Sequence, residues 1–570
     1  MEFDVAIIGG GPGGSTVGSI LRKYDPTMRV GIFEREVFPR DHVGESQLPG
    51  IGAVLAEMGV WEKIEAANFP IKLGATYRWG KSKELWDFQF IPKEQFVEEV
   101  RPARYVGQRT QTAFQVDRAI YDEILLKHSE ELGCDVFQGV GVAMVNRDGD
   151  RVTGLELTDG RVVVAKHYID ASGHSGILRR AMGVNIDVAT SLQNVAFWDY
   201  WQNAEWATEI GIGGTFVQVM SLGYGWIWFI PLGPTRTSVG LIVPADYYKK
   251  SGARPEELYR KALGEDDRIR HLMRDAVSEE KFETTKDWSF MADRHAGENW
   301  MLVGEAGGFA DPILAAGMTI THISAREAAN TILEARRGRL PAEWLREQYD
   351  IRQKRRIRNH IRFADFWYTS NGQFTDLQDL TAQIAKDSGL DLDPAKAWQW
   401  IAQGGFIDED LSFGSGGYTL EALKRLPNFL NDYEVESVLV GKNRLELKID
   451  DADIVTRAFY GAGSVERIEG FSRDGRILPL RWVIQPLINI LRVEKSLGGV
   501  LEKLEAMRET MQVDEGRKNL FMSASLRGLE AMVTDGWVIA SYDPSFSRVE
   551  LNELYSGLEW SDDLTVGPAI

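Results

Sequence analysis

The sequence predicts an α/β (α+β) protein built from a parallel sheet, an antiparallel sheet and a separate C-terminal domain. Three observations favour this fold. Residues 5–33 read as strand, glycine turn, helix and strand, which is the βαβ opening of a parallel sheet. Residues 185–290 contain aromatic-rich segments typical of antiparallel strands. The pattern then changes to short amphipathic strands and helices, so we expect a core at 1–369 and an α+β domain of unassigned role at 370–570.

The composition limits the classes of function. The chain has 65 basic and 84 acidic residues, a net charge of −19, which disfavours binding to nucleic-acid phosphates. Its single cysteine, Cys134, leaves no intrachain disulfide or cysteine metal cluster and is typical of a reducing compartment. No charged leader and no apolar run of membrane-spanning length is visible. We therefore expect a cytoplasmic protein with no nucleic-acid, membrane or metal partner.

The first glycine turn carries a dinucleotide-binding pattern. It satisfies G-x-G-x-x-G between an apolar strand and a helix, and an acid ends the next strand 20 residues after its last glycine. Such glycines let the backbone approach a pyrophosphate at the helix N-terminus, and the acid can bind a ribose. A glycine-rich turn without a ligand is the alternative, and the strand, helix and acid together disfavour it. The predicted binding residues are Gly9, Gly11, Pro12, Gly13, Gly14 and Glu34.

Two more signatures follow in the chain. Residues 169–173 (Ile-Asp-Ala-Ser-Gly) end a strand and, alone, could be any turn. Residues 300–312 form a buried strand and a small-residue turn that leads to an Asp-Pro and a helix. The three together resemble the FAD domain of the aromatic-hydroxylase superfamily, which implies a Rossmann-like domain with FAD beneath the antiparallel sheet. The family usually has Gly-Asp at Gly304-Glu305, and we expect the longer acid still to reach the ribitol. The further FAD contacts that the resemblance implies are Arg35, Arg40, Glu45, Ser46, Arg118, Asp170, Gly173, Gly304, Glu305, Pro312 and Gly317.

Two further motifs narrow the class of FAD-binding protein. Trp226 and Trp228 in Gly-Trp-Ile-Trp-Phe-Ile-Pro lie two apart, so they share one face of a strand. Lys72 opens the segment Lys-Leu-Gly-Ala-Thr-Tyr-Arg-Trp-Gly, which ends at Gly80. Taken singly, the first motif could be a packed aromatic strand and the second a surface lysine.

Together these motifs resemble those of the flavin-dependent halogenases, and the resemblance covers about residues 1–365. The sequence is most similar to carrier-bound-substrate (alkyl/acyl) halogenases such as that of chloramphenicol biosynthesis. The resemblance implies that a separate flavin reductase supplies reduced FAD, which with oxygen and chloride gives HOCl. It implies that Lys72 holds the HOCl by a hydrogen bond or as a chloramine, and that Trp226 and Trp228 crowd the flavin. Chloride would bind the backbone amides of Ala316 and Gly317, and an acyl or peptidyl carrier protein is a possible partner.

One departure bears on the substrate. Tryptophan-specific members carry a glutamate in the segment after the Asp-Pro, where this chain has Leu314. The missing acid argues against free tryptophan and favours an already activated carbon, such as a phenol or the methylene of a β-keto or malonyl thioester. We expect chlorination of a natural-product precursor, as in antibiotic biosynthesis.

Other functions stay open from the sequence alone. An FAD-dependent aromatic hydroxylase would share the flavin signatures but would need neither Lys72 nor the paired tryptophans. A reductase of isoprenoid chains or a flavin-binding sensor are further alternatives.

A basic stripe lies in the segment from Met318 to about Phe366, which reads as helical with a break at 338–341. The spacing of its arginines predicts one helix face that could dock an acidic carrier. The alternative is a solvated face paired with Glu347 and Asp350. The stripe consists of Arg352, Arg355, Arg358 and Arg362, flanked by Lys354 and Arg356.

Overall fold

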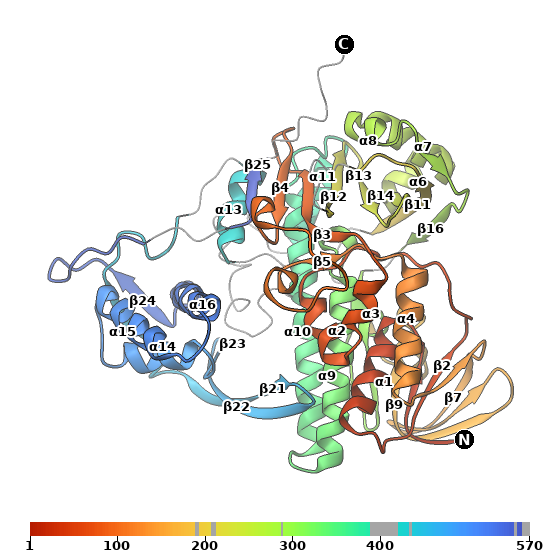
Figure 1. The fold of residues 1–570 in the computed structure, drawn as a ribbon, viewed down its shortest axis with the longest axis horizontal. Helices are drawn as coiled ribbons and strands as arrows, with labels where there is room; N and C mark the ends of the chain where they lie inside the picture. The colour runs from red at the N-terminus through yellow and green to blue at the C-terminus, as the bar shows by residue number, and fades with distance from the viewer. Residues whose placement is uncertain are drawn as a thin grey trace. The chain divides into compact units, whose positions relative to one another are not determined.

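The computed structural model describes residues 1–188, 193–206, 213–286, 289–387, 420–431, 436–551 and 556–560 (Figure 1). The chain divides into two compact units. The core unit comprises Met1–Gly389, Tyr460–Val465 and Gly557–Ile570, and the C-terminal unit comprises Leu390–Phe459 and Glu466–Ser556. The boundary differs from the one expected at residue 370, because the core unit extends to Gly389 and takes in two later segments.

A parallel sheet organises the core unit, as the βαβ pattern predicted. Its strand order is β6-β2-β1-β9, and β18 also pairs with β9. Ile8 and Leu302 both pair with Asp170 in parallel register, so β1, β9 and β18 end side by side. The three flavin signatures follow these three strand ends and therefore meet at one edge of the sheet. The elements are β1 (Glu2–Ile8), α1 (Pro12–Tyr24), β2 (Val30–Glu34), β6 (Asp135–Gln138), β9 (Val162–Asp170) and β18 (Trp300–Leu302), with β7 (Val142–Asp148) and β8 (Arg151–Leu157) as an antiparallel extension.

The antiparallel sheet is larger than predicted because strands from outside 185–290 join it. The order β11-β14-β13-β12 continues into β3 and β4, and a strand close to the C-terminus, β25, pairs with β4. The strand that carries Lys72 thus runs parallel to β12 and two strands from the paired tryptophans. The strands are β3 (Ile71–Arg78), β4 (Trp86–Gln89), β11 (Asn194–Gln202), β12 (Gly214–Leu222), β13 (Gly225–Pro231), β14 (Arg236–Pro244) and β25 (Leu558–Trp560).

The two faces of this sheet have different neighbours. Ile227, Phe229 and Leu241 on one face pack into a core with Leu258 and Tyr259 of α7 (Pro255–Glu265). We call this the outer face. The opposite face, the inner face, carries the alternate residues, which include both predicted tryptophans.

Helices complete the core unit. α9 (Gly317–Arg337) packs on α1 and on α10 (Ala342–Thr369). The predicted break at 338–341 is confirmed, since α9 ends at Gly338 with a left-handed φ of 67°. The other helices beside the candidate site are α2 (Gly50–Met58), α3 (Trp61–Ala66) and α4 (Arg118–Glu131).

Residues 460–465 form the tip of a hairpin and belong to the core unit because they contact its helices. Arg326 and Asn330 of α9 donate hydrogen bonds to the carbonyl of Gly461 at 2.7 and 2.9 Å. Glu57 accepts the amide of Gly463 at 3.2 Å. The turn between β21 (Asp453–Gly461) and β22 (Ser464–Arg473) is therefore bound to the core helices.

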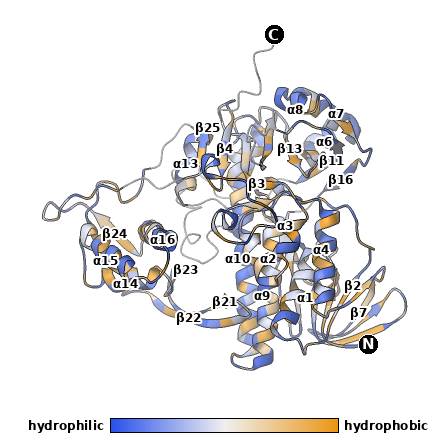
Figure 2. Cartoon of the chain, in the orientation of Figure 1, coloured by the Kyte–Doolittle hydropathy of each residue, from blue (hydrophilic) through white to orange (hydrophobic). Residues whose placement is uncertain are grey.

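The C-terminal unit is α+β, as predicted. Short strands pair in two small sheets, and three helices pack on one another through residues such as Leu487 and Leu529, which are fully buried. Hydrophilic and hydrophobic residues alternate along these helices (Figure 2). The elements are α13 (Leu420–Asn431), β20 (Arg444–Leu447), β23 (Arg476–Pro479), α14 (Ile484–Leu491), α15 (Leu497–Thr510), α16 (Glu515–Thr534) and β24 (Val538–Ser541).

No helix among the described residues is both long and apolar enough to cross a membrane. In the same part of the chain, no group of three or more His, Cys, Asp or Glu side chains is arranged to hold a metal ion.

Candidate active site

In the glycine turn after β1, Gly14 is required by the packing of the protein itself, whereas Gly11 leaves space for a ligand. A Cβ on Gly14 would lie 1.9 Å from the carbonyl oxygen of Gly9, so that glycine permits the close packing of helix on strand. A Cβ on Gly11 would meet only Nη2 of Arg40, at 3.5 Å. The space above Gly11 is therefore open to a pyrophosphate at the start of α1. This geometry fits FAD.

Glu34 lies against the same turn. Its Oε2 accepts the amide of Gly10 at 2.7 Å and its Oε1 accepts the amide of Glu36 at 2.9 Å. Each carboxylate oxygen keeps a further lone pair for a ribose hydroxyl. Arg35, by contrast, is exposed and pairs with Glu36 at 3.4 Å, so it lies outside the buried site.

The second and third signatures meet at the strand ends. A Cβ on Gly173 would lie 4.0 Å from Oε2 of Glu305. Burial raises the pKa of the Glu305 carboxyl, and the positive charge of Arg118 opposes this. Asp170 accepts hydrogen bonds from Ser172, Leu178 and Arg179, so its carboxylate shapes the turn. Gly173 and Glu305 are thus better placed than Asp170 to contact a cofactor.

Arg118 fixes the loop that contains Glu45. Its guanidinium binds both oxygens of Asp122, at 2.7 and 2.9 Å, and donates to the carbonyls of Val43 and Gly44 at 2.9 and 3.1 Å. Arg40 forms an ion pair with the same Asp122 at 3.2 Å. The buried Asp122, which is not among the predicted site residues, thus holds both predicted arginines.

The loop places two polar side chains inside the protein. Glu45 is 2% exposed, and burial raises the pKa of its carboxyl to about 7, opposed by the hydroxyls of Ser238 and Tyr200. Oγ of Ser46 is buried without a hydrogen-bond partner among the described residues. A buried hydroxyl in this state is a candidate contact for a bound cofactor.

Lys72 is buried in β3. Its side chain is 2% exposed, and Nζ donates to the carbonyl of Gln47 at 2.9 Å and lies 5.3 Å from the ring of Phe90. No carboxylate pairs with this amine in the described part of the chain. Burial alone lowers its pKa to about 7, so a large fraction is neutral and nucleophilic near neutral pH.

The rest of the segment that Lys72 opens anchors the end of α10. A Cβ on Gly74 would lie 1.9 Å from the carbonyl oxygen of Phe88, so β3 and β4 need a glycine there. Nε1 of Trp79 donates to the carbonyl of Trp367 at 2.9 Å. The amide of Gly80 donates to Asn371 at 3.3 Å.

The inner face of the sheet carries the predicted tryptophans. Trp226 and Trp228 have ring centroids 6.3 Å apart. Nε1 of Trp228 donates to Ser238 at 3.1 Å, and Nε1 of Trp226 donates to Tyr368 at 2.9 Å. Trp198 lies two strands away on the same face, and among the described residues its buried Nε1 has no acceptor. The period-two pattern in β11 could have revealed this third tryptophan.

The start of α9 fits an anion. Ala315 has a left-handed φ of 50°, after which Ala316 and Gly317 open the helix, whose first amides have no intrahelical acceptor. Oγ1 of Thr319 is fully buried and lacks a partner among the residues that the structure covers. The side chain of Leu314 lies outside the described residues. Pro312 opens the short helix η5 (Pro312–Leu314) just before this turn.

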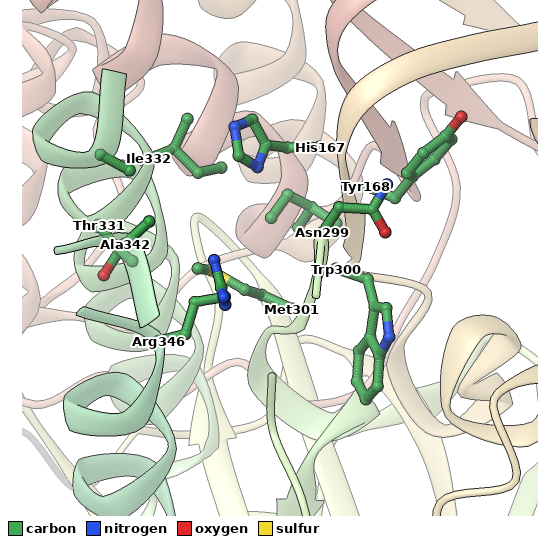
Figure 3. A pocket seen from close by; sticks show the side chains of 11 residues that line it. His167, Tyr168, Asn299, Trp300, Met301, Thr331, Ile332, Ala342 and Arg346 are labelled. Carbon is green, nitrogen blue, oxygen red and sulfur yellow. The ribbon is translucent and has the colours of Figure 1, made fainter. Parts of the chain in front are cut away.

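The pocket in Figure 3 lies elsewhere. It lies between β9, β18, α9 and α10, and it is lined by His167, Trp300, Met301 and Arg346 among others. None of the predicted site residues lines it. It is therefore not the candidate active site.

The predicted arginine stripe is not a single free face. Arg352 and Arg356 bind the buried Glu327 at 2.6 and 2.8 Å. Lys354 pairs with Asp350 at 2.7 Å, as the solvated alternative expects. The stripe as a continuous docking surface is wrong, because the helix turns part of it inward, toward α9. Arg358 and Arg362 are exposed, and Arg355 is half-buried.

These features define a flavoprotein in which a buried amine lies near an aromatic sheet face. The chain matches the tryptophan halogenase family over residues 4–106 and 91–376 and belongs to that family.

Two relatives of the chain are also named as halogenating enzymes. The chain is 32% identical over 385 residues to a 1H-pyrrole-2-carbonyl-(peptidyl-carrier protein) chlorinase of Pseudomonas fluorescens, covering 66% of this chain and 85% of the relative. It is 30% identical to a tryptophan 2-halogenase of Chondromyces crocatus, covering 58% of this chain and 60% of that one.

Solved structures share the fold. The myxobacterial chondrochloren halogenase CndH matches with a TM-score of 0.59 at 28% identity, covering 69% of this chain and 91% of that one. CmlS, a flavin-dependent halogenase, matches with a TM-score of 0.71 at 24% identity over 98% of this chain and 99% of its own. The protein is thus a flavin-dependent halogenase that uses FAD, a halide and oxygen, and such halogenases need a flavin reductase.

Proposed function

We propose that this halogenase chlorinates an activated carbon of a carrier-bound acyl group and that Lys72 carries the chlorine to that carbon. The observation that carries the proposal is the buried Lys72 amine, which has a pKa of about 7 and no carboxylate beside it in the described residues. An amine paired with a carboxylate would stay protonated and could not act as a nucleophile.

The residues of the site have distinct tasks in this proposal. When bound, FAD supplies the reducing electrons that turn oxygen and chloride into HOCl. The turn at Gly11 and the acid Glu34 hold the cofactor's phosphates and ribose. The amides of Ala316 and Gly317 hold chloride. Glu45, with a pKa of about 7, can take up or release a proton beside the cofactor.

Lys72 then binds the hypochlorous acid or reacts with it. It either donates a hydrogen bond to HOCl or forms a chloramine. In the second case nitrogen bonds to chlorine, the Cl–O bond breaks, and the departing hydroxide takes a proton from nitrogen as water. The substrate carbon next takes chlorine from nitrogen and loses its own proton, and the amine recovers a hydrogen. Trp226 and Trp228 would narrow the space beside the flavin, which disfavours direct hydroxylation.

Two observations support the substrate class. The chlorinase relative is named for a pyrrole-2-carbonyl group on a peptidyl-carrier protein. Leu314 replaces the acid that would deprotonate an indole intermediate. The carrier would be acidic, so the exposed Arg358 and Arg362 are the remaining basic positions of the stripe where it could dock.

The test is mass spectrometry of acyl groups on carrier proteins after incubation with a flavin reductase, NADH, oxygen and chloride. The proposal expects chlorinated acyl-carrier product and little product from the same acyl group in free form. Equal chlorination of the free compound would contradict the carrier.

A further inference from the structure

Tyr368 joins two parts of the active site through one hydroxyl. It accepts a hydrogen bond from Nε1 of Trp226 at 2.9 Å and donates to Oδ1 of Asp311 at 2.9 Å. Asn194 donates to the other oxygen of Asp311 at 3.1 Å. Burial and the neighbouring Asp311 raise the pKa of Tyr368 well above its usual range, so the hydroxyl stays protonated and keeps its donor role.

Asp311 in turn shapes the start of α9. Its Oδ1 also accepts the amide of Ile313 at 2.9 Å, which opens η5. The carbonyl of Pro312 accepts the amide of Ala315 at 2.8 Å, and that of Ala316 accepts the amide of Ile320 at 2.9 Å. The Asp311 carboxylate is therefore connected through one tight turn to the start of α9.

The backbone at Tyr368 does not depend on its hydroxyl. The adjacent Trp367 carbonyl accepts Nε1 of Trp79 at 2.9 Å, and Asn371 donates to Ser221 at 2.7 Å. These bonds fix the end of α10 against the antiparallel sheet. Removing only the hydroxyl is thus a local change.

We propose that Tyr368 is a positioning residue that holds Trp226 and the Asp311 turn at one fixed spacing, so that the amides of α9 bind halide beside the tryptophan face. This rests on the proposed halide site. Without the hydroxyl, the turn loosens and halide binds more weakly. A larger share of reduced flavin and oxygen then ends as oxidised flavin and hydrogen peroxide.

The chain offers a matched control on the outer face. Tyr259 is 1% exposed, accepts Nε1 of Trp201 at 2.9 Å and donates to the carbonyl of Val239 at 2.9 Å. It therefore bridges an indole N–H and an acceptor as Tyr368 does, but it has no link to the Asp311 turn. Tyr259→Phe removes the same chemical group from the other side of the sheet.

The experiment titrates the oxidised holoenzyme with chloride and bromide and follows the flavin absorbance. Tyr368→Phe should keep its FAD content and raise the halide Kd about tenfold, the effect of losing one hydrogen bond to a charged group. In turnover, the KM for chloride should rise while the KM for reduced flavin stays unchanged. Tyr259→Phe should leave both halide constants unchanged. Asn194→Leu, which removes the other hydrogen bond to the Asp311 carboxylate without changing any charge, gives a second test and should raise the halide Kd in the same direction.

Three results would overturn the inference: parental halide affinity in both Tyr368→Phe and Asn194→Leu, an equal loss in Tyr259→Phe, or no halide response in the parent. Halide binding as expected, with no chlorination of any carrier-bound acyl group, would refute the proposed substrate and leave the role of Tyr368 standing.

Discussion

The two faces of the antiparallel sheet have opposite relations to their surroundings. On the outer face, apolar residues such as Phe229 and Leu241 are fully buried against α7. Among the described residues of the inner face, the buried indole of Trp198 has an unused N–H, and Lys72 in β3 of the same sheet is a buried amine without a carboxylate partner. Unused buried hydrogen-bond donors cost stability, so the inner face keeps donors that are available to a bound ligand. One face thus stabilises the fold, and the other is the face on which we propose that the chemistry takes place.

The largest expected effect concerns Lys72. Lys72→Ala should retain FAD and oxygen consumption but lose chlorinated product by at least about 100-fold, since the group that carries the chlorine is absent. Hydrogen peroxide or free HOCl should accumulate instead, which a scavenger assay beside product mass spectrometry would measure. Chlorination at the parental rate would remove Lys72 from the mechanism.

The glycine turn shows a similar contrast between a position that the fold needs and a position that the cofactor needs. Gly11→Val should fold but purify without flavin, because a side chain there would enter only the space that the pyrophosphate needs. Gly14→Val should fail to fold, because its Cβ would lie 1.9 Å from the carbonyl oxygen of Gly9. Absorbance at the flavin bands, with circular dichroism of the apo protein, separates the two outcomes. Normal flavin content in Gly11→Val would show that the cofactor lies elsewhere.

Substitution of one aromatic residue on each face should affect stability on the outer face and product formation on the inner face. Phe229→Ala on the outer face should lower the free energy of unfolding by about 3–5 kcal/mol, the usual cost of a large core truncation. The ratio of chlorinated product to hydrogen peroxide should not change. Trp228→Phe on the inner face should cost less stability but lower that ratio. Denaturant melts and product analysis of both variants test this, and a reversed pattern would contradict the assignment of the faces.

Much of the candidate cofactor site could be predicted from the sequence. The signatures at 9–14, 169–173 and 300–312 are local and end parallel strands, so their meeting at one edge follows from the βαβ pattern. Tyr368 could not be predicted, because its partners Trp226 and Asp311 come from distant segments and a tyrosine at a helix end looks ordinary. Such contacts depend on tertiary packing rather than on a local pattern.

The same limit applies to the unit boundary and to the arginine stripe. Residues 460–465 return to α9 through backbone carbonyls, which carry no sequence signal. Arg352 and Arg356 point to Glu327, whose burial only the packing of α9 on α10 reveals.

A pH-dependent stability tests whether burial of the Lys72 amine lowers the free energy of unfolding. Burial lowers its pKa from 10.5 to about 7 in the folded protein, so between these values the unfolded chain binds a proton that the folded chain lacks. Stability therefore rises with pH across this window, and the penalty is complete below pH 7 and absent above 10.5. Lys72→Met, of similar length but uncharged, should remove the penalty. Its melting temperature should exceed that of the parent at pH 6, and the difference should shrink as the pH approaches 10. A difference that is independent of pH would show that Lys72 titrates normally in the folded protein, and the nucleophilic role proposed for its neutral amine would then lose its physical basis.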